Sequence, residues 1–116
     1  MINCTLKDEK TIELDMQGDI TAADYKKIEP ELLELFGQKG KMKFLIQLDR
    51  LKSFGPGAVY EDIKFDLQNL KNIGPTAIVG DKKSQALMTK FIDKIFPERV
   101  KFFEATGEAL QWLRTA

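Results

Sequence analysis

The segment from Asp49 to Gly57 holds the residues whose types and spacing best fit ligand recognition. An apolar run ends before Asp49, Ser53 supplies a hydroxyl group, and Gly55-Pro56-Gly57 has the composition of a helix start. A helix that begins there offers unpaired backbone N–H groups and the positive end of its dipole to an anionic group. Pro56 removes one donor, whereas the glycines allow a ligand to approach the backbone closely. The alternative interpretation is a Gly-Pro turn that serves geometry alone.

Two side chains around this junction, Ser53 and Tyr60, each have two interpretations. Ser53 is either a turn or capping residue or a site of phosphorylation. Tyr60 either stacks on a ligand or packs half-buried against the sheet with its hydroxyl in water. Glu61 and Asp62 are adjacent in sequence, and neighbours on a helix project about 100° apart, so we do not predict an acid–base pair. Phe54 adds apolar surface to the junction if it is exposed.

A second glycine-led segment runs from Gly80 to Ser84 with the sequence Gly-Asp-Lys-Lys-Ser. Its composition is similar to that of a phosphate-binding loop, but the spacing of the P-loop motif is absent. The alternative is a helix start, in which Asp81 or Ser84 caps the helix and the lysines are solvated. We keep Asp81 as a candidate binding residue.

The helix expected after this loop, which ends near residue 96, carries more apolar side chains than one face of a sheet needs to bury. Lys90 and Lys94 lie on its remaining surface, and Arg99 follows. Such a helix can contact a membrane surface, a protein partner or a second copy of the chain. The alternative is a wide buried stripe between the sheet and a neighbouring helix. The candidate contact residues are Met88, Phe91 and Ile92.

Composition excludes several classes of function. The chain of 116 residues has no histidine and one cysteine, so we expect no structural zinc site, no cofactor and no acid–base catalysis by imidazole. Its 18 basic and 18 acidic residues balance, which does not favour nucleic-acid binding. The start of the chain lacks the pattern of a signal peptide, and the lone Cys4 cannot form an internal disulfide. A cytoplasmic, non-enzymatic protein is the expectation that fits.

Hydrophobic periodicity alternates between values near 2 and near 3.6, which predicts one α/β domain over residues 1–116. Thr21 and Asp24 have the spacing of a helix capping box, and Gly74-Pro75 and Thr106 are predicted to end one helix and to cap another. The predicted strands are 2–6, 11–16, 42–48, 76–79 and 100–103, and the predicted helices are 22–37, 56–73, 81–96 and 106–113. The buried stripe predicted for the second helix is Val59, Ile63, Leu67 and Leu70.

This order predicts a mostly parallel sheet of about five strands with about four helices, in which the first strand is antiparallel. In open sheets of this kind, ligands bind beyond the carboxyl ends of the strands. Three segments are expected to meet at that edge, namely Gly18–Thr21, Asp49–Gly57 and Gly80–Lys83.

Three motifs carry a resemblance to a known family. They are F-G-P-G-A-V-Y-E-D-I-K at residues 54–64, Thr76-Ala77-Ile78-Val79 before Gly80-Asp81, and V-K-F-F followed by A-L-Q-W-L within residues 100–113. With the element order, they resemble the SpoIIAA-like bacterial proteins of STAS/SEC14 type across the whole chain. Classical members carry a phosphorylatable serine at the start of the second helix. Here residues 54–57 have no hydroxyl group, which departs from that pattern.

The resemblance implies a non-enzymatic binding or regulatory module that contacts an unknown protein partner through the start of the second helix and through the third helix. Similarity in overall shape to CRAL-TRIO domains implies the alternative, a carrier or sensor of a small hydrophobic ligand or lipid with peripheral membrane contact. A homodimer is compatible with both.

Overall fold

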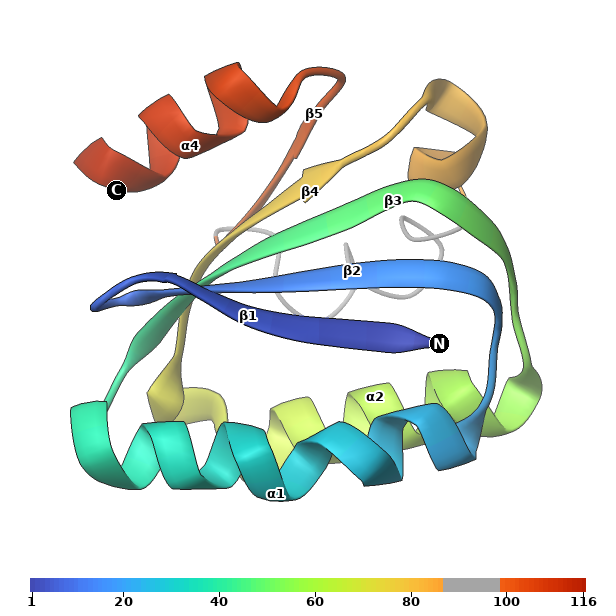
Figure 1. Ribbon diagram of the computed structural model, residues 1–116, viewed down its shortest axis with the longest axis horizontal. Coiled ribbons are helices and arrows are strands. Elements are labelled where there is room, and N and C mark those ends of the chain that lie inside the picture. The colour runs from blue at the N-terminus through green and yellow to red at the C-terminus, as the bar shows by residue number, and fades with distance from the viewer. Residues whose placement is uncertain (87–98) are drawn as a thin grey trace.

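The computed structural model describes residues 1–86 and 99–116 (Figure 1). Residues 82–86 are helical and begin the predicted third helix, whose candidates Met88, Phe91 and Ile92 lie outside the described residues. The strands are β1 (Ile2–Asp8), β2 (Thr11–Ile20), β3 (Met42–Phe54), β4 (Ile73–Val79) and β5 (Val100–Phe103). Helix α1 spans Ala22–Lys39, α2 spans Pro56–Gln68, the 3₁₀ turn η1 spans Leu70–Asn72 and α4 spans Thr106–Thr115.

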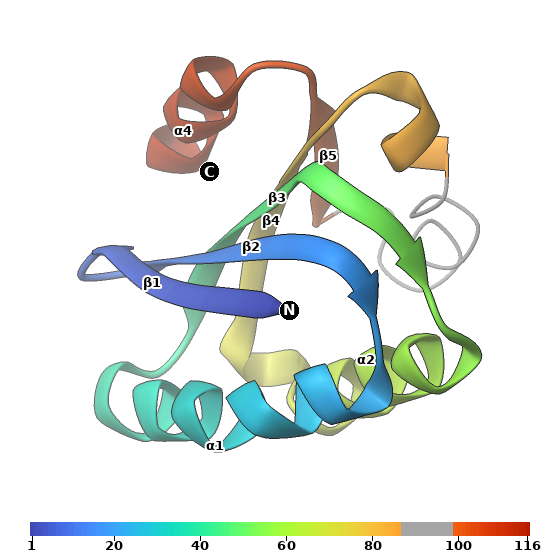
Figure 2. The same ribbon diagram turned by 45° about the vertical axis from the view of Figure 1, so that its right-hand side comes forward.

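The strands form one sheet in the order β1-β2-β3-β4-β5. β1 pairs antiparallel with β2, and every later pair of neighbours is parallel. Helices α1 and α2 lie side by side under one face of the sheet, and α4 lies over the other face (Figure 1). Figure 2 shows the same separation from a second direction. The predicted fold class, with its antiparallel first strand, is therefore confirmed.

Side chains that alternate along the central strands build a separate core on each face. On β3, Phe44 and Leu48 point to the core that α1 and α2 cover, whereas Leu45 belongs to the core under α4. On β4, Ile78 and Ala77 divide in the same way. This double burial explains the nearly continuous apolar run that predicted a strand covered on both faces.

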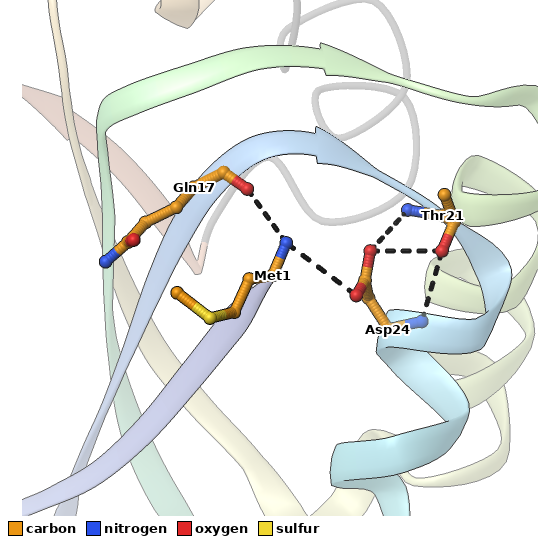
Figure 3. A network of polar contacts seen from close by, with 4 residues as sticks. All are labelled: Met1, Gln17, Thr21 and Asp24. Atoms are coloured by element: carbon orange, nitrogen blue, oxygen red, sulfur yellow. Dashed lines mark hydrogen bonds and ion pairs between the residues drawn. The ribbon is translucent and has the colours of Figure 1, made fainter.

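The predicted capping box at the start of α1 is present (Figure 3). The backbone N–H of Thr21 donates to Asp24 Oδ2 at 2.8 Å, and the N–H of Asp24 donates to Thr21 Oγ1 at 3.3 Å. The amino group of Met1 donates to the Gln17 carbonyl at 2.8 Å and lies 3.7 Å from Asp24 Oδ1. These contacts join β1, β2 and α1 at one corner, and the bond from the Thr21 N–H lowers the pKa of Asp24.

The polar turn predicted directly after residue 48 is wrong, because β3 continues to Phe54. β2 is also longer than predicted, so pairing persists: Gln17 lies opposite Arg50, and Ile20 lies opposite Phe54. The register of the pairing shifts between these pairs, as at a β-bulge. The shifts let polar residues be part of the strand while the apolar residues keep facing the core. Asp49 and Ser53 are therefore strand residues rather than loop residues.

The buried stripe predicted for α2 is wrong for Leu67 and Leu70, whereas Val59 and Ile63 are partly buried. Leu67 is 53% exposed and Leu70 is exposed, whereas Ala58, Glu61 and Phe65 are buried. The buried face of the helix therefore differs from the predicted one, and it includes Glu61, although a charged side chain usually faces solvent. Pro56 does occupy the first turn, as predicted.

Two predicted helix boundaries need correction, and one is confirmed. Gly74-Pro75 lies inside β4 instead of ending a helix, since η1 makes that turn. Thr106 lies within α4, where its hydroxyl contacts the Gln47 side chain at 3.1 Å, and Ala105 is the N-cap. Asp81 caps the helical residues 82–86, because its Oδ1 accepts the Ser84 N–H at 2.8 Å.

Close packing between β3 and β4 predicts the effect of Gly74→Ala. A Cβ atom at Gly74 would lie 2.9 Å from the backbone oxygen of Met42. We expect a loss of about 1–3 kcal/mol in the free energy of unfolding, as for other overpacked sites, measured by urea denaturation. The control is Gly107→Ala, which meets no atom within 4 Å and lies in α4. It is expected to be neutral or to stabilise by up to about 1 kcal/mol, and equal losses in both variants would contradict the packing argument.

Candidate functional site

Two of the three segments that were expected to meet beyond the carboxyl ends of the strands, Gly18–Thr21 and Asp49–Gly57, are in contact. Ser53 Oγ donates to Asp19 Oδ1 at 2.7 Å, and the Gly55 N–H donates to the Ile20 carbonyl at 2.9 Å. Ser53 is exposed and does not cap α2, whose N-cap is Gly55 and has no side-chain cap. A strand hydroxyl paired with a carboxylate on the neighbouring strand replaces the predicted turn or cap.

The third predicted segment meets the second in a shallow surface hollow. Asp49 and the residues from Gly80 to Lys83 line it together with Glu104. The hollow carries charges of both signs. The hydrogen bonds from the Ser84 and Lys83 N–H groups hold the pKa of Asp81 below its usual value. The juxtaposition expected at this edge is present for the described residues.

Two aromatic candidates at the edge have different surroundings from those predicted. Tyr60 is 66% exposed, so the interpretation of a half-buried ring against the sheet is wrong. Phe54 is partly buried and packs against the core beneath the sheet, so it adds little exposed apolar surface. Gly57 approaches the start of α1 closely, because a Cβ atom there would lie 3.3 Å from Cβ of Ala22.

A feature that was not predicted lies beneath the sheet, between β2–β5 and the two helices. It is a cavity of about 60 Å³. Its walls are mostly apolar, but four polar side chains from α1 and α2 also reach it. The apolar lining residues are Leu14, Met16, Ile28, Leu32, Phe44, Ile46, Phe65, Ile73 and Val100, and the polar ones are Tyr25, Glu29, Asp62, Asp66, Thr76 and Arg99.

The polar wall of the cavity is the seam between α1 and α2. Tyr25 and Glu29 are one turn apart on α1, and Asp62 and Asp66 are one turn apart on α2. Tyr25 is 5% exposed. Its hydroxyl oxygen and Oε1 of Glu29 are buried without a hydrogen-bond partner among the residues that the structure describes. Unpartnered buried polar atoms are uncommon, and each calls for a partner such as water, an ion or a ligand, or for a functional role.

The seam changes the acidity of its groups. Burial raises the pKa of Asp62 to about 6, despite an opposing effect of the nearby Tyr25 hydroxyl. Burial and the charge of Asp62 raise the pKa of Asp66 well above its usual value. Burial likewise raises the pKa of Tyr25, and the nearby Asp62 raises it further without a hydrogen bond of good geometry. The pKa of Glu29 is raised by burial and by its neighbour Glu61.

Glu61 is buried behind the seam, and its Oε1 lies 3.9 Å from Nζ of Lys26. Within residues 1–86 and 99–116, no ion pair reaches Glu29, Asp62 or Asp66. The same residues contain no group of three or more side chains placed to hold a metal ion. None of the described helices is long and apolar enough to cross a bilayer. The seam is therefore a set of weakly compensated carboxyl groups beside an apolar space.

A signal for this seam was present in the sequence. Tyr25, Ile28, Glu29 and Leu32 follow at i, i+3, i+4 and i+7, which places Glu29 on the buried face of its helix. Asp62 and Asp66 flank Phe65 in the same way. Comparison of Glu61 with its neighbour Asp62 alone could not predict that polar side chains of α1 and of α2 line one cavity together.

A family model described as SpoIIAA-like matches residues 11–114. This chain belongs to the SpoIIAA-like family. Among solved structures, a protein with a SpoIIAA-like fold from Shewanella loihica is similar with a TM-score of 0.79 and 25% identity, over 97% of this chain and 92% of that one. No curated protein matches the sequence significantly.

Two structures of SpoIIAA itself share the fold of this SpoIIAA-like chain. The unphosphorylated anti-sigma factor antagonist aligns with a TM-score of 0.70 and 13% identity, over the full length of both chains. The phosphorylated Bacillus protein aligns with a TM-score of 0.70 and 11% identity, over 98% of this chain and all of that one. At these identities the likeness concerns the fold alone.

The raised pKa of Asp62 predicts a dependence of stability on pH. Its value of about 6 in the folded protein exceeds the ordinary value of 3.8, so the folded state holds this proton more tightly. The resulting stabilisation is complete below about pH 4 and is lost as the pH rises through about 6. Asp62→Asn is expected to raise the free energy of unfolding at about pH 7.5 by about 1–3 kcal/mol relative to the unmodified protein.

Urea denaturation at both pH values measures this effect. Near pH 4 most of the gain from Asp62→Asn should disappear, since the carboxyl group is then protonated in the folded state and about half protonated in the unfolded state. Glu34→Gln is the matched control, because it removes an equal charge from the exposed side of α1. An equal gain at both pH values, or an equal gain in the control, would refute the assignment.

Proposed function

We propose that this SpoIIAA-like protein is a non-enzymatic binding module that takes up a small, largely apolar ligand in the cavity beneath its sheet. The observation that carries the proposal is the buried hydroxyl of Tyr25, which has no hydrogen-bond partner among the described residues and lies in the wall of a mostly apolar cavity. Binding sites for small molecules are commonly apolar with a few convergent polar groups and perturbed pKa values.

The size of the cavity limits the ligand. An engineered cavity of about 150 Å³ binds benzene, and this one measures about 60 Å³. A group of a few heavy atoms fits, and a whole acyl chain does not fit without rearrangement. We therefore propose a small molecule, or the end of a larger one, in preference to an enclosed lipid. The membrane contact expected from Met88, Phe91 and Ile92 concerns residues outside those described.

The chemistry of the lining favours binding over catalysis. Among the described lining residues there is no cysteine or serine, and Thr76 Oγ1 already donates to the Gly74 carbonyl at 3.1 Å. The carboxyl groups have raised pKa values, which suit proton exchange with a ligand.

The first test is a titration with 1-butanol followed by ¹H–¹⁵N NMR. We expect saturable shifts of the amide signals of lining residues such as Leu14 and Phe65. Ile28→Phe places a larger side chain in the cavity and should weaken binding at least tenfold. Leu33→Phe adds the same kind of bulk on the exposed side of α1 and should leave binding unchanged. Shifts that are absent, or equal in both variants, would end the proposal.

The surface edge supports a second candidate function, contact with a protein partner. Its favouring observation is the exposed Tyr60 near the start of α2, close in the chain to the Ser53–Asp19 pair. Exposed aromatic residues are enriched at protein interfaces. A phosphate on Ser53 would place negative charge against Asp19 and break the 2.7 Å bond, which would give the edge two states.

A photo-crosslinking residue in place of Tyr60, with the protein expressed in its native host, tests the second candidate. We expect one defined adduct whose yield falls at least fivefold when Asp49→Ala is added at the same edge. The same crosslinker at position 33, on the exposed side of α1, is the control. Equal adducts from both positions would contradict a specific edge, and an adduct with a second copy would assign a homodimer.

A further inference from the structure

The acidic seam between α1 and α2 selects the chemical class of the ligand. We propose that the cavity binds a short aliphatic molecule with a protonated amine, whose ammonium group lies between Tyr25 and Glu29 of α1 and Asp62 and Asp66 of α2. This inference rests on the proposed function and adds the charge of the ligand to it. Nothing in the family match assigns such a site.

The geometry places the polar groups at one wall. Tyr25 is buried and unpartnered, and Oε1 of Glu29 is buried and unpartnered among the described residues. Asp62 and Asp66 line the same cavity and are partly exposed, so they stand between the apolar space and solvent. A ligand seated in the apolar part would therefore carry its polar end at this wall.

The charge of the cavity wall determines which polar group of a ligand would fit there. Among the described residues, three carboxyl groups line the cavity, and no cation forms an ion pair with any of them. Lys26 and Lys64 act on Glu29 from outside and only partly offset its environment. A buried carboxylate without a counter-ion is costly, and an ammonium group on the ligand would compensate it. A carboxylate ligand would add a further negative charge to the same wall.

Arg99 is the cation to weigh against this view, because it also lines the cavity. Its Nη1 donates to the Leu70 carbonyl at 3.0 Å and to the Ile73 carbonyl at 3.1 Å. These bonds tie the guanidinium to the turn before β4. It lies within 4 Å of no described carboxylate oxygen, so it does not neutralise the seam.

Hydrogen bonding agrees with charge. An ammonium group has three donors and no acceptor, and the seam offers carboxylate oxygens together with the Tyr25 oxygen. Each donor can therefore meet an acceptor. A cavity of about 60 Å³ limits the apolar part to a short chain, which makes n-butylamine a suitable probe.

The experiment compares n-butylamine, 1-butanol and butyrate, which share a chain and differ in charge, by NMR titration at about pH 7.5 and fixed salt. At this pH the amine is protonated and Asp62 is ionised. We expect n-butylamine to bind at least tenfold more tightly than 1-butanol, with shifts at Ile28 and Phe65, and butyrate to bind most weakly. Asp62→Asn should remove most of the tenfold preference, whereas Glu34→Gln should keep it.

The outcomes separate the two proposals. If 1-butanol shifts the lining residues and n-butylamine binds no more tightly, the amine inference fails and the apolar-ligand function stands. If none of the three probes shifts those residues, both fail. Tight binding of butyrate, or amine shifts confined to surface residues, would also overturn the inference. Asp66→Asn is a second variant, in case Asp62→Asn alters the fold; it removes another carboxyl group from the same wall and should also lower the preference for the amine.

Near pH 5 the preference for the amine over 1-butanol should decrease, because Asp62 is then largely protonated. The titratable and charged groups that line the cavity with Asp62 are Tyr25 and Glu29 on α1, Asp66 on α2, and Arg99 before β5. The preference should fall in the unmodified protein and change little in Asp62→Asn. An equal pH dependence in both would assign the effect to another group and overturn the placement of the ammonium at Asp62.

Discussion

The long parallel pairing between β2 and β3 determines where both helices of the lower layer begin. The two strands stay paired through polar residues until Ile20 and Phe54, which lie opposite each other. α1 and α2 start within two residues of those positions, and the Gly55 N–H donates to the Ile20 carbonyl. The two helices therefore begin side by side at the same edge of the sheet, as Figure 1 shows.

The spacing of the two helices follows from this shared origin. Gly57 on α2 faces Ala22 on α1 so closely that a Cβ atom would lie 3.3 Å from that of Ala22. The small residues let the helix starts approach each other. One turn further on, Tyr25 and Glu29 meet the side of α2 that carries Asp62 and Asp66. The position of the acidic seam is thus a consequence of strand pairing and small residues at the helix starts.

Local signals predicted much of the fold, and non-local ones explain the errors. Thr21 and Asp24 formed the expected capping box, and β5 has the predicted bounds, since both depend on neighbours in sequence. The extension of β3 was missed because its partner, β2, stabilises polar residues that look like a turn. The face of α2 was misplaced because Glu61 is buried although its type favours solvent.

For the candidate site, too, one part could be predicted from the sequence and another part could not. Topology alone brought Asp49, Ser53 and Asp81 to one edge, because parallel strands end together. The cavity required knowledge of which polar side chains turn inward, and this depends on the rotation of α2 against α1. Here the residues that break the hydrophobic pattern are those that line the cavity, as is expected of sites that sacrifice stability for function.

The unpartnered polar atoms of the seam also bear on how this protein would respond to selection. Substituting apolar residues for buried carboxyl groups commonly stabilises a fold. A screen that rewards only heat resistance would therefore accumulate changes at Tyr25, Glu29, Asp62 and Asp66, and the resulting proteins would keep the fold while losing the site. Sequences that retain the acidic seam would then reveal a requirement other than stability, and the persistence of these groups across relatives would measure it.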